Sequence, residues 1–498
     1  MCVVNRGAQS EGRRSARVMV CASLALAVLV APLVAQAESL NEALASAYAT
    51  NPNLEAQRAA TRATDEGVPQ ARAGLLPQIY GEAAAGYERE TISVDSNIIN
   101  NLIPGLNFPP NAKLNTRNKP HGYSFTLQQQ IFKGLQTINA IREAEANSMA
   151  SREDLRNTEQ TTLLDAVSAY MDVVQNLAIV RLKDNNVRVL SDQLASNERR
   201  FKGGELTRTD LAQSRSQRSS AIAGLAAAKA QYQSSRATFE EVVGHSPGPL
   251  FMPPSIEPIL PESLEAAIEI AMYENPTVGS AFYQEVAAGK SVDQIRGELL
   301  PEVSVKLKYN DLYDPFEGIE YDRTAIAGVN VKVPIYQGGL VDSKVRQAKQ
   351  LQLQRRSQLQ QAQAQTRSSV ISAWTQLVSA RAQLEADQVS VESNRIAVDG
   401  VRREEKTGKR TLLDVLNQQQ TDLNARVAVV SDQRNVIVAE YTLLQAIGRL
   451  NSVYLQLPVS EYRADITDHS ERVLIWRTEI KPEQDYYLEE GYVIEGER

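Results

Sequence analysis

Hydrophobic and polar positions alternate in two separate parts of this chain. Val303, Val305, Leu307 and Tyr309 are separated by polar or basic residues, and the stretch from Val329 to Ile335 shows the same alternation. In the earlier part, the apolar positions are Tyr123, Phe125, Leu127 and Ile131. A period of two predicts β-strands with one apolar and one polar face. Such hairpins suit either a soluble core with one wet face or a barrel wall with lipid outside and water inside.

A long region without proline follows each alternating stretch. These regions lie between Pro120 and Pro247 and between Pro334 and Pro458, and Ala, Gln, Arg, Leu and Ser dominate them. We expect a single helix from about Ile138 to Phe201, which at 1.5 Å per residue would be roughly 100 Å long. No globular core needs a helix of that length.

Glycine-rich turns divide each region into an outgoing and a returning helix. We expect the turns at Gly203 and Gly204 and at Gly408, with the returning helices ending at Gly244 and Gly448. Just after each turn, a threonine precedes an aspartate by three residues, which is the spacing of a capping box. The two pairs are Thr207 with Asp210 and Thr411 with Asp414.

The chain contains two copies of one unit. In the opening part of each copy, matching residues are 224 positions apart, as in Asn51 and Pro52 against Asn275 and Pro276. Further along the offset is 204, as in Gly204 against Gly408. Many pairs in register indicate a duplication and therefore a repeat architecture. In both copies Pro follows Asn at a helix start, where Asn caps and Pro takes the first helical position.

The change of offset gives the first copy 20 extra residues between Ile79 and Ile131. We expect an irregular exposed loop there, because the insertion is rich in asparagine, glycine and proline. The resulting organisation is a signal peptide (1–37), a first repeat (38–247), a linker (248–261), a second repeat (262–457) and a tail (458–498).

The first 37 residues read as a secretory signal. Arginines precede an apolar run from Val18 to Val34, and Ala35, Gln36 and Ala37 form a small-residue cleavage site. The alternative is a retained membrane anchor, for which the apolar run is short. Both cysteines, Cys2 and Cys21, lie in this segment, so the mature chain has none.

Loss of the signal changes the charge balance. It removes four arginines and one glutamate, which leaves 49 basic and 59 acidic residues and a net charge of −10. Nucleic acid is therefore not an expected partner. Beyond the signal there is no run of 18 apolar residues, so a membrane crossing would use β-strands.

Two hairpins give four strands per chain, and four strands cannot close a barrel. Open strand edges are not viable in lipid, so a chain that uses these strands in a membrane must assemble with other copies. Strand counting allows barrels of 8, 12 or 16 strands.

The duplicated motifs resemble the TolC family of outer-membrane factors. They are Asn-Pro at 51–52 and 275–276, Leu-Pro at 76–77 and 300–301, the stretch from Pro334 to Gly339, and the Gly-Thr-Asp turns. The resemblance implies a mixed α and β membrane protein: a homotrimer whose 12-stranded outer-membrane β-barrel, with four strands per chain, continues into a long periplasmic α-helical barrel. It also implies a periplasmic adaptor and an inner-membrane ABC or proton-driven transporter as partners.

The resemblance also assigns roles at the periplasmic entrance, where the helical turns meet. Asp414 matches the first constricting aspartate, and Asn417 stands where the second would be, so we expect weaker cation selectivity than a double acid ring gives. Arg410 matches a gate arginine, with Thr209 and Asp210 as its partners. Glu405 occupies the gate tyrosine position, so that link is missing or replaced. Capping alone would also explain an acid at Asp210 and Asp414.

Motifs for other chemistry are weak. Gly289, Lys290 and Ser291 look like the end of a phosphate-binding loop, but the upstream glycine position is Gln284 and the run lies in a helical repeat. The three histidines have no ligand spacing, and no nucleophile motif, metal site or cofactor is predicted. An enzyme and a periplasmic hairpin adaptor are the alternatives to an export channel. The cargo, secreted proteins or small toxic compounds, is not encoded in these patterns.

Overall fold

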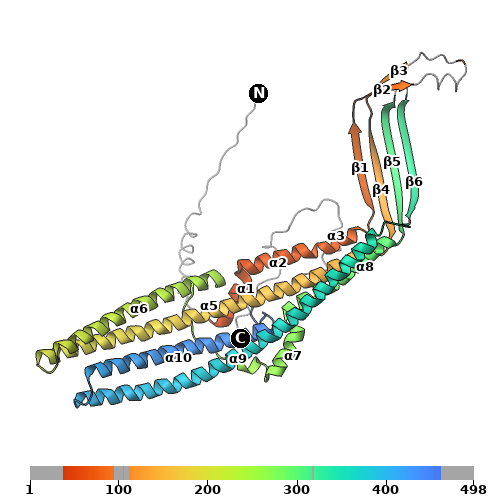
Figure 1. Ribbon diagram of the computed structural model, residues 1–498. Helices are drawn as coiled ribbons and strands as arrows, with labels where there is room; N and C mark the ends of the chain where they lie inside the picture. Colours follow the sequence, from red (N-terminus) through yellow and green to blue (C-terminus); the bar gives the residue numbers. More distant parts are fainter. Residues whose placement is uncertain (1–37, 95–104, 106–111, 317–318, 461, 463–498) are drawn as a thin grey trace, which may run out of the picture.

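The computed structural model describes residues 38–94, 105, 112–316, 319–460 and 462. It consists of a long bundle of helices with an upright β-sheet at one end (Figure 1). The expected signal peptide and residues 463–498 of the tail lie outside the described residues.

Helices of matching length occur in the two halves of the chain. The first half contains α1 (Leu40–Thr50), α2 (Pro52–Asp65), α3 (Gly67–Ala73), α5 (Gln136–Lys202) and α6 (Arg208–Val243). The second half contains α7 (Leu264–Glu274), α8 (Pro276–Arg296), α9 (Leu340–Lys406) and α10 (Leu412–Ile447), with short 3-10 turns at Glu257–Ile259 and Gly297–Leu299. The long helices α5 and α9 have 67 residues each, and the returning helices α6 and α10 have 36 each.

The caps expected from the sequence are present. The side chain of Asn51 accepts hydrogen bonds from the backbone N–H groups of Asn53 and Leu54, and Pro52 is the first residue of α2. Asn275 and Pro276 begin α8 in the same way. Gly244 and Gly448 end α6 and α10 with φ of 94° and 88°, a left-handed conformation that glycine adopts without strain.

One antiparallel sheet has the order β1-β4-β5-β6. Its strands are β1 (Gln78–Ala85), β4 (His121–Lys133), β5 (Glu302–Phe316) and β6 (Ile319–Lys332). Each half of the chain thus supplies two strands, and the two strand pairs meet at β4 and β5.

The register corrects two details of the expected alternation. A bulge between Gln130 and Phe132 places Phe132, and not Ile131, opposite Val303. Strand β6 ends at Lys332, so Val333 and Ile335 lie beyond it in an extended connection. A bulge inserts one unpaired residue, which is why a strict count of two fails after it.

The prediction that the insertion is an irregular loop was only partly correct. Strands β2 (Glu88–Val94) and β3 (Ala112–Asn118) form a separate antiparallel pair within it. The sequence pattern did not predict these strands because they are mostly polar and lack a clear apolar face. Backbone groups can pair across two strands without such a face. The asparagines and prolines expected in the loop lie between them, at 95–104 and 106–111, outside the described residues.

Close backbone contact joins the sheet to the helices. Gly134, in the turn between β4 and α5, has φ of 55°, and a Cβ there would collide with the carbonyl oxygen of Gly297. Gly297 lies between α8 and β5, so two glycines let the two halves of the chain cross at the base of the sheet.

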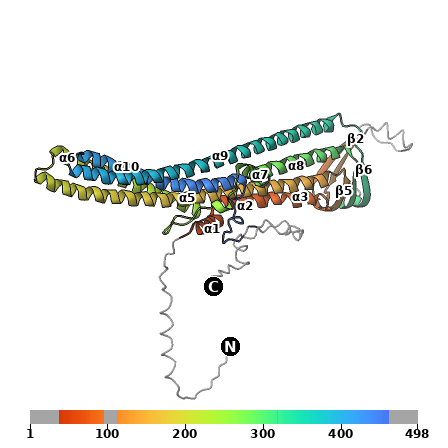
Figure 2. The same ribbon diagram turned by 90° about the horizontal axis from the view of Figure 1, so that it is seen from below.

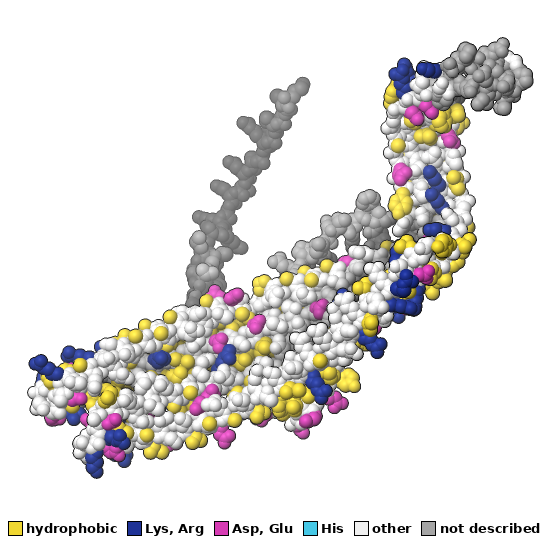
Figure 3. All heavy atoms as spheres, in the orientation of Figure 1, with side chains coloured by type: hydrophobic (Ala, Val, Ile, Leu, Met, Phe, Trp, Pro, Cys, Tyr) yellow, Lys and Arg dark blue, Asp and Glu magenta, His cyan; other side chains and the backbone are white. Residues whose placement is uncertain are grey.

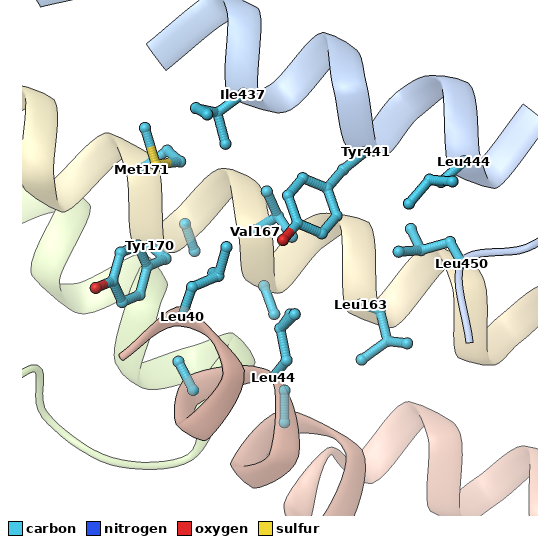
Figure 4. Packing of buried hydrophobic residues seen from close by; sticks show 14 of the residues in the cluster. Leu40, Leu44, Leu163, Val167, Tyr170, Met171, Ile437, Tyr441, Leu444 and Leu450 are labelled. Carbon is cyan, nitrogen blue, oxygen red and sulfur yellow. The ribbon is translucent and has the colours of Figure 1, made fainter. Parts of the chain in front are cut away.

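The main core lies at the middle of the bundle, where α1 crosses the long helices. Leu44 of α1 and Leu163 of α5 are fully buried, as is Leu444 of α10 (Figure 4). Among the described residues, α5 is the one helix long and apolar enough to cross a membrane by length and composition alone. Its buried apolar side chains, among them Leu163 and Val167, pack in this core.

The segment that connects the two halves of the chain packs across this middle region. Glu440 of α10 is fully buried and accepts hydrogen bonds from Ser255 Oγ at 2.7 Å and from the backbone N–H of Ile256 at 3.1 Å. Arg381 of α9 pairs with the same carboxylate at 3.0 Å. The start of the tail also packs here, with Tyr462 against Arg58 of α2.

Candidate functional site

Both helical turns lie at the end of the bundle farthest from the sheet (Figure 1). The α5–α6 and α9–α10 hairpins run side by side to that end, as Figure 2 also shows. Gly204 and Gly408 have φ of 80° and 75°, so each turn uses a left-handed glycine to reverse the chain. Charged side chains of both signs gather at this end of the molecule (Figure 3).

The two predicted acids are held by their own turns. Asp210 Oδ2 accepts hydrogen bonds from the backbone N–H of Thr207 at 3.0 Å, and Asp414 does so from Thr411 at 2.9 Å. Both capping boxes are complete. These backbone hydrogen bonds lower the pKa of each carboxyl group, so both acids are ionised at neutral pH. The capping prediction is confirmed.

The other predicted residues at the entrance lie near these acids. Asn417 is exposed on α10, one turn after Asp414, and Thr209 is exposed in the first turn of α6. Arg410 pairs with Glu404 of its own hairpin, Nε to Oε2, at 3.3 Å. Within the described chain, the contacts found for Arg410 and Asp210 do not join them, so that link stays a prediction for assembled copies.

Sequence reasoning missed the partner of Glu405. Arg200 in the last turn of α5 donates from Nη1 to Glu405 Oε1 at 2.9 Å, which joins the two hairpins. The signal in the sequence was an acid in the last turn of α9, where the helix dipole disfavours negative charge. Only the packing of two hairpins shows which cation compensates it.

Apolar and amide contacts join the hairpins beside this ion pair. Leu190 of α5 forms a small buried cluster with Leu412 and Leu416 of α10. Gln419 of α10 donates to Gln193 of α5 at 3.3 Å.

At the opposite end of the molecule, the sheet has two chemically different faces. The register places Leu127 beside Leu307, and Phe125 beside Tyr309, on one face. The other face carries glutamine, lysine, asparagine and threonine, as in the pair of Thr126 with Lys308. The alternation predicted from the sequence therefore holds across paired strands.

One acid on the apolar face has partners on a single oxygen, Oδ2, while its buried Oδ1 has no hydrogen-bond partner in the described chain. Asp311 is 1% exposed and accepts from Arg323 Nε at 3.0 Å and from the Tyr123 hydroxyl at 3.2 Å. Tyr309 and Tyr313 also donate to it, each at 3.4 Å. An ion pair ringed by hydroxyl groups is how an apolar face tolerates a carboxylate.

The edges of the molecule carry unpaired surfaces. Within the described strands, β1 pairs only with β4 and β6 only with β5, so the outer side of each is free. Helix α9 exposes large aliphatic residues along one side, with Val378 at 55%, Val389 at 64% and Ile396 at 63%. Helix α6 exposes a stripe of small side chains: Ala223, Ala226, Ala227, Ala230 and Ala237.

The family model for outer membrane efflux proteins matches residues 43–245 and 267–449. The chain is 35% identical over 433 residues to the outer membrane efflux protein BepC of Brucella suis, which covers 86% of this chain and 90% of BepC. It is 22% identical to the outer membrane protein TolC of Escherichia coli, over 84% of each chain. It is also 26% identical to the alkaline protease secretion protein AprF of Pseudomonas aeruginosa, over 66% of this chain and 68% of AprF.

Solved structures share the fold. The crystal structure of CusC, a protein described as forming a transmembrane channel, matches with a TM-score of 0.69 at 16% identity. The match covers 82% of this chain and 92% of CusC.

Proposed function

Because the chain belongs to the outer membrane efflux protein family, and so lies in the outer membrane and extends into the periplasm, we propose that three copies assemble into one continuous export tunnel. The sheets form a 12-stranded barrel with four strands from each copy, and the helices continue it as a periplasmic tube. One observation carries this proposal. The two outer strands of the sheet each have a side without a strand partner in the described chain, and the outer helix α9 exposes large apolar side chains.

The sheet supports closure by other copies. The free side of β6 in one copy can pair with the free side of β1 in the next, which removes every open edge. The face with Leu127, Leu307 and Tyr309 then meets lipid, and the face with Lys306 and Lys308 lines the water-filled interior.

Helices α6 and α9 support the same arrangement. They lie at opposite edges of the part of the bundle that holds the turns, outside α5 and α10 (Figure 1). Val378, Val389 and Ile396 of α9 in one copy project outward, and the small alanine side chains of α6 in the next copy leave space for them. Burying one such valine or isoleucine contributes about 1.5–3 kcal/mol, enough for repeated contacts to hold copies together.

We further propose that the two halves arose by duplication, as repeats 38–247 and 262–457. The equal lengths of α5 and α9, and of α6 and α10, support this, as does their identical order. The first hairpin differs by carrying the β2–β3 pair.

At the entrance, three copies of Asp414 form a single ring of acids, with Asn417 beside it. Like charges focused in a narrow neck repel anions and favour cations. Arg410 of one copy links to Thr209 and Asp210 of a neighbouring hairpin. Glu405 pairs instead with Arg200 of its own chain. The lowered pKa of Asp414 supports a ring that stays charged at neutral pH.

The partners are a periplasmic adaptor and an inner-membrane transporter, which supplies the energy. The tunnel itself catalyses no reaction and needs no cofactor. Relatives named for efflux and for protease secretion both match this chain, so secreted proteins and small toxic compounds are the two cargo classes.

The test is ion conduction by the purified protein. The full chain after signal removal is reconstituted in a planar lipid bilayer, and its mass in detergent is measured by light scattering. We expect discrete conductance steps from a trimer. A monomeric, water-soluble product that conducts no ions contradicts the proposal.

A further inference from the structure

The first hairpin continues beyond the four-stranded sheet without a change of register. Strands β1 and β4 end at the pair of Ala85 with His121, and β2 and β3 begin three residues further along each strand. Between the two pairs of strands, the backbone N–H of Gly86 donates to the carbonyl oxygen of Pro120 at 2.8 Å. Residues that share a face of β1 and β4 are therefore followed, by the same alternation, by one face of the β2–β3 ribbon.

That face of the ribbon carries basic and neutral polar residues. We call it the basic face, and its three successive pairs are Arg89 with Arg117, Thr91 with Asn115, and Ser93 with Lys113. The Thr91 hydroxyl donates to Asn115 Oδ1 at 2.8 Å, as expected of side chains on the same face. The acids Glu88 and Glu90 of β2 alternate with these residues and so lie on the opposite face. The basic face therefore contains no acid among these pairs.

The two arginines are directly opposite each other, and the folding of the ribbon gives no reason for this. Like charges in direct opposition destabilise an antiparallel pair. Both side chains are exposed, and within the described residues the ion pairs include neither Arg89 nor Arg117. An anion bound between two guanidinium groups converts their repulsion into attraction, and a phosphate group suits the donor geometry of arginine.

Toward the middle of the sheet, the same face becomes aromatic and then apolar. His121 and Tyr123 come first along β4, and Phe125 and Leu127 follow. Aromatic side chains favour the boundary between lipid and water, and basic side chains attract anionic head groups. The order of apolar, aromatic and basic residues thus matches the order of layers in a lipid leaflet. The ribbon lies at the end of the sheet farthest from the helices (Figure 1), where Figure 3 shows Lys and Arg side chains.

Resting on the barrel proposed above, we propose that the basic face binds the anionic head groups of lipid in the outer leaflet, with Arg89 and Arg117 sharing one phosphate group. Lys113 adds a third positive charge to the same face. Lipid suits this surface better than an acidic protein does, because the basic face continues into the apolar face that is proposed to contact the lipid chains. A trimer carries three such ribbons around its outer rim.

The experiment measures lipid binding by the full chain after signal removal, purified in a neutral detergent. Native mass spectrometry gives dissociation constants for diphosphoryl lipid A, which has two phosphate groups, and for phosphatidylcholine, which has no net charge. We expect the wild type to bind lipid A more tightly. R89Q/R117Q should weaken lipid A binding by at least about tenfold, because each arginine beside an anionic lipid contributes roughly a fivefold factor.

Two further variants separate charge from folding. R89K/R117K keeps both charges and should stay within about threefold of the wild type, with the difference due to the lost guanidinium geometry. The matched control is E88Q/E90Q, which removes two charges from the opposite face of the same ribbon and should not weaken lipid A binding. Helical circular dichroism and the mass in detergent confirm that every variant folds and assembles.

Equal affinity of the wild type for the two lipids overturns the proposal, and so does unchanged lipid A binding in R89Q/R117Q. Poly-glutamate is the probe for an acidic protein partner. If R89Q/R117Q keeps lipid A but loses poly-glutamate, the basic face is a protein-docking surface and not a lipid site. Conductance in a planar bilayer keeps the channel function separate: R89Q/R117Q should conduct as the wild type does, whereas a wild type that conducts no ions contradicts the channel function itself.

Discussion

At the scale of single residues, Asp414 serves its helix and its proposed pore at once. Its carboxylate closes the capping box of α10, and this geometry fixes where the charge points. The same carboxylate can therefore serve both the helix cap and the proposed pore. Removing it would change helix stability and pore charge together, so the pore role is better tested by adding a charge nearby.

We predict that Asn417→Asp raises cation selectivity. Residue 417 is exposed one turn after Asp414, on the same side of α10, so a second carboxylate adds to the ring. The permeability ratio of potassium to chloride, from reversal potentials across a salt gradient, should rise by about twofold or more. The control is Asn417→Gln, which keeps an amide. If both variants match the wild type, α10 does not line the constriction at this point.

A second residue-scale prediction concerns a carboxyl pair between α9 and α10. Burial is the largest cause that raises the pKa of Asp432 to about 6, and a hydrogen bond with Asp387 adds to it. The folded state therefore holds a proton more tightly than the unfolded state. The stability that this proton brings is fully present below the ordinary pKa of 3.8 and is lost as pH rises through about 6.

Asp432→Asn should remove this dependence. Thermal unfolding, followed by helical circular dichroism, should show the variant gaining more over the wild type at pH 8 than at pH 5. Asp422→Asn, which breaks a pair with Arg426 within α10, is the control and should show no such gain. Equal differences at both pH values contradict the shared proton.

At the scale of elements, the short helix α1 stabilises the middle of the long ones. A helix of 67 residues has no core of its own, so it needs crossing elements to fix its position. Leu40, Leu44 and Ala47 of α1 are buried in the main core, where α1 packs on α5 and α6, and the connecting segment bound by Glu440 also packs on this core. Among the described residues, the large buried cluster thus lies at the middle of the bundle and not at the turns, where the entrance is proposed.

We predict that Leu44→Ala destabilises this region by about 2–5 kcal/mol, the usual cost of a cavity in a packed core. Limited proteolysis should cut the α1–α2 segment faster than in the wild type. Leu413→Ala is the control, because Leu413 is 43% exposed. Equal cleavage of both variants would show that α1 does not depend on this packing.

At the scale of the whole molecule, the single described chain leaves strand edges and apolar helix surfaces uncovered. Its sheet has two free edges, and its helical edges present large residues on one side and small residues on the other. Neither surface gains stability until another copy covers it. These free edges are the reason that we propose assembly with other copies.

Much of this architecture was predictable from the sequence. Helix lengths, turns, caps and the alternating strands depend on local periodicity and on Asn, Pro, Gly and Thr at fixed positions, and these rules act over a few residues. The bulge at Ile131 and the β2–β3 pair were missed because neither changes the local hydrophobic pattern.

Tertiary structure alone decided which charges meet. Arg200 and Glu405 are 205 residues apart, and Asp311 needs groups from three strands. An ion pair between distant segments leaves no periodic trace, because either partner could pair locally, as Arg410 does with Glu404. The sequence by itself thus determined the repeated elements, because local periodicity sets them, while the packing of the two hairpins determined which charges meet at their turns.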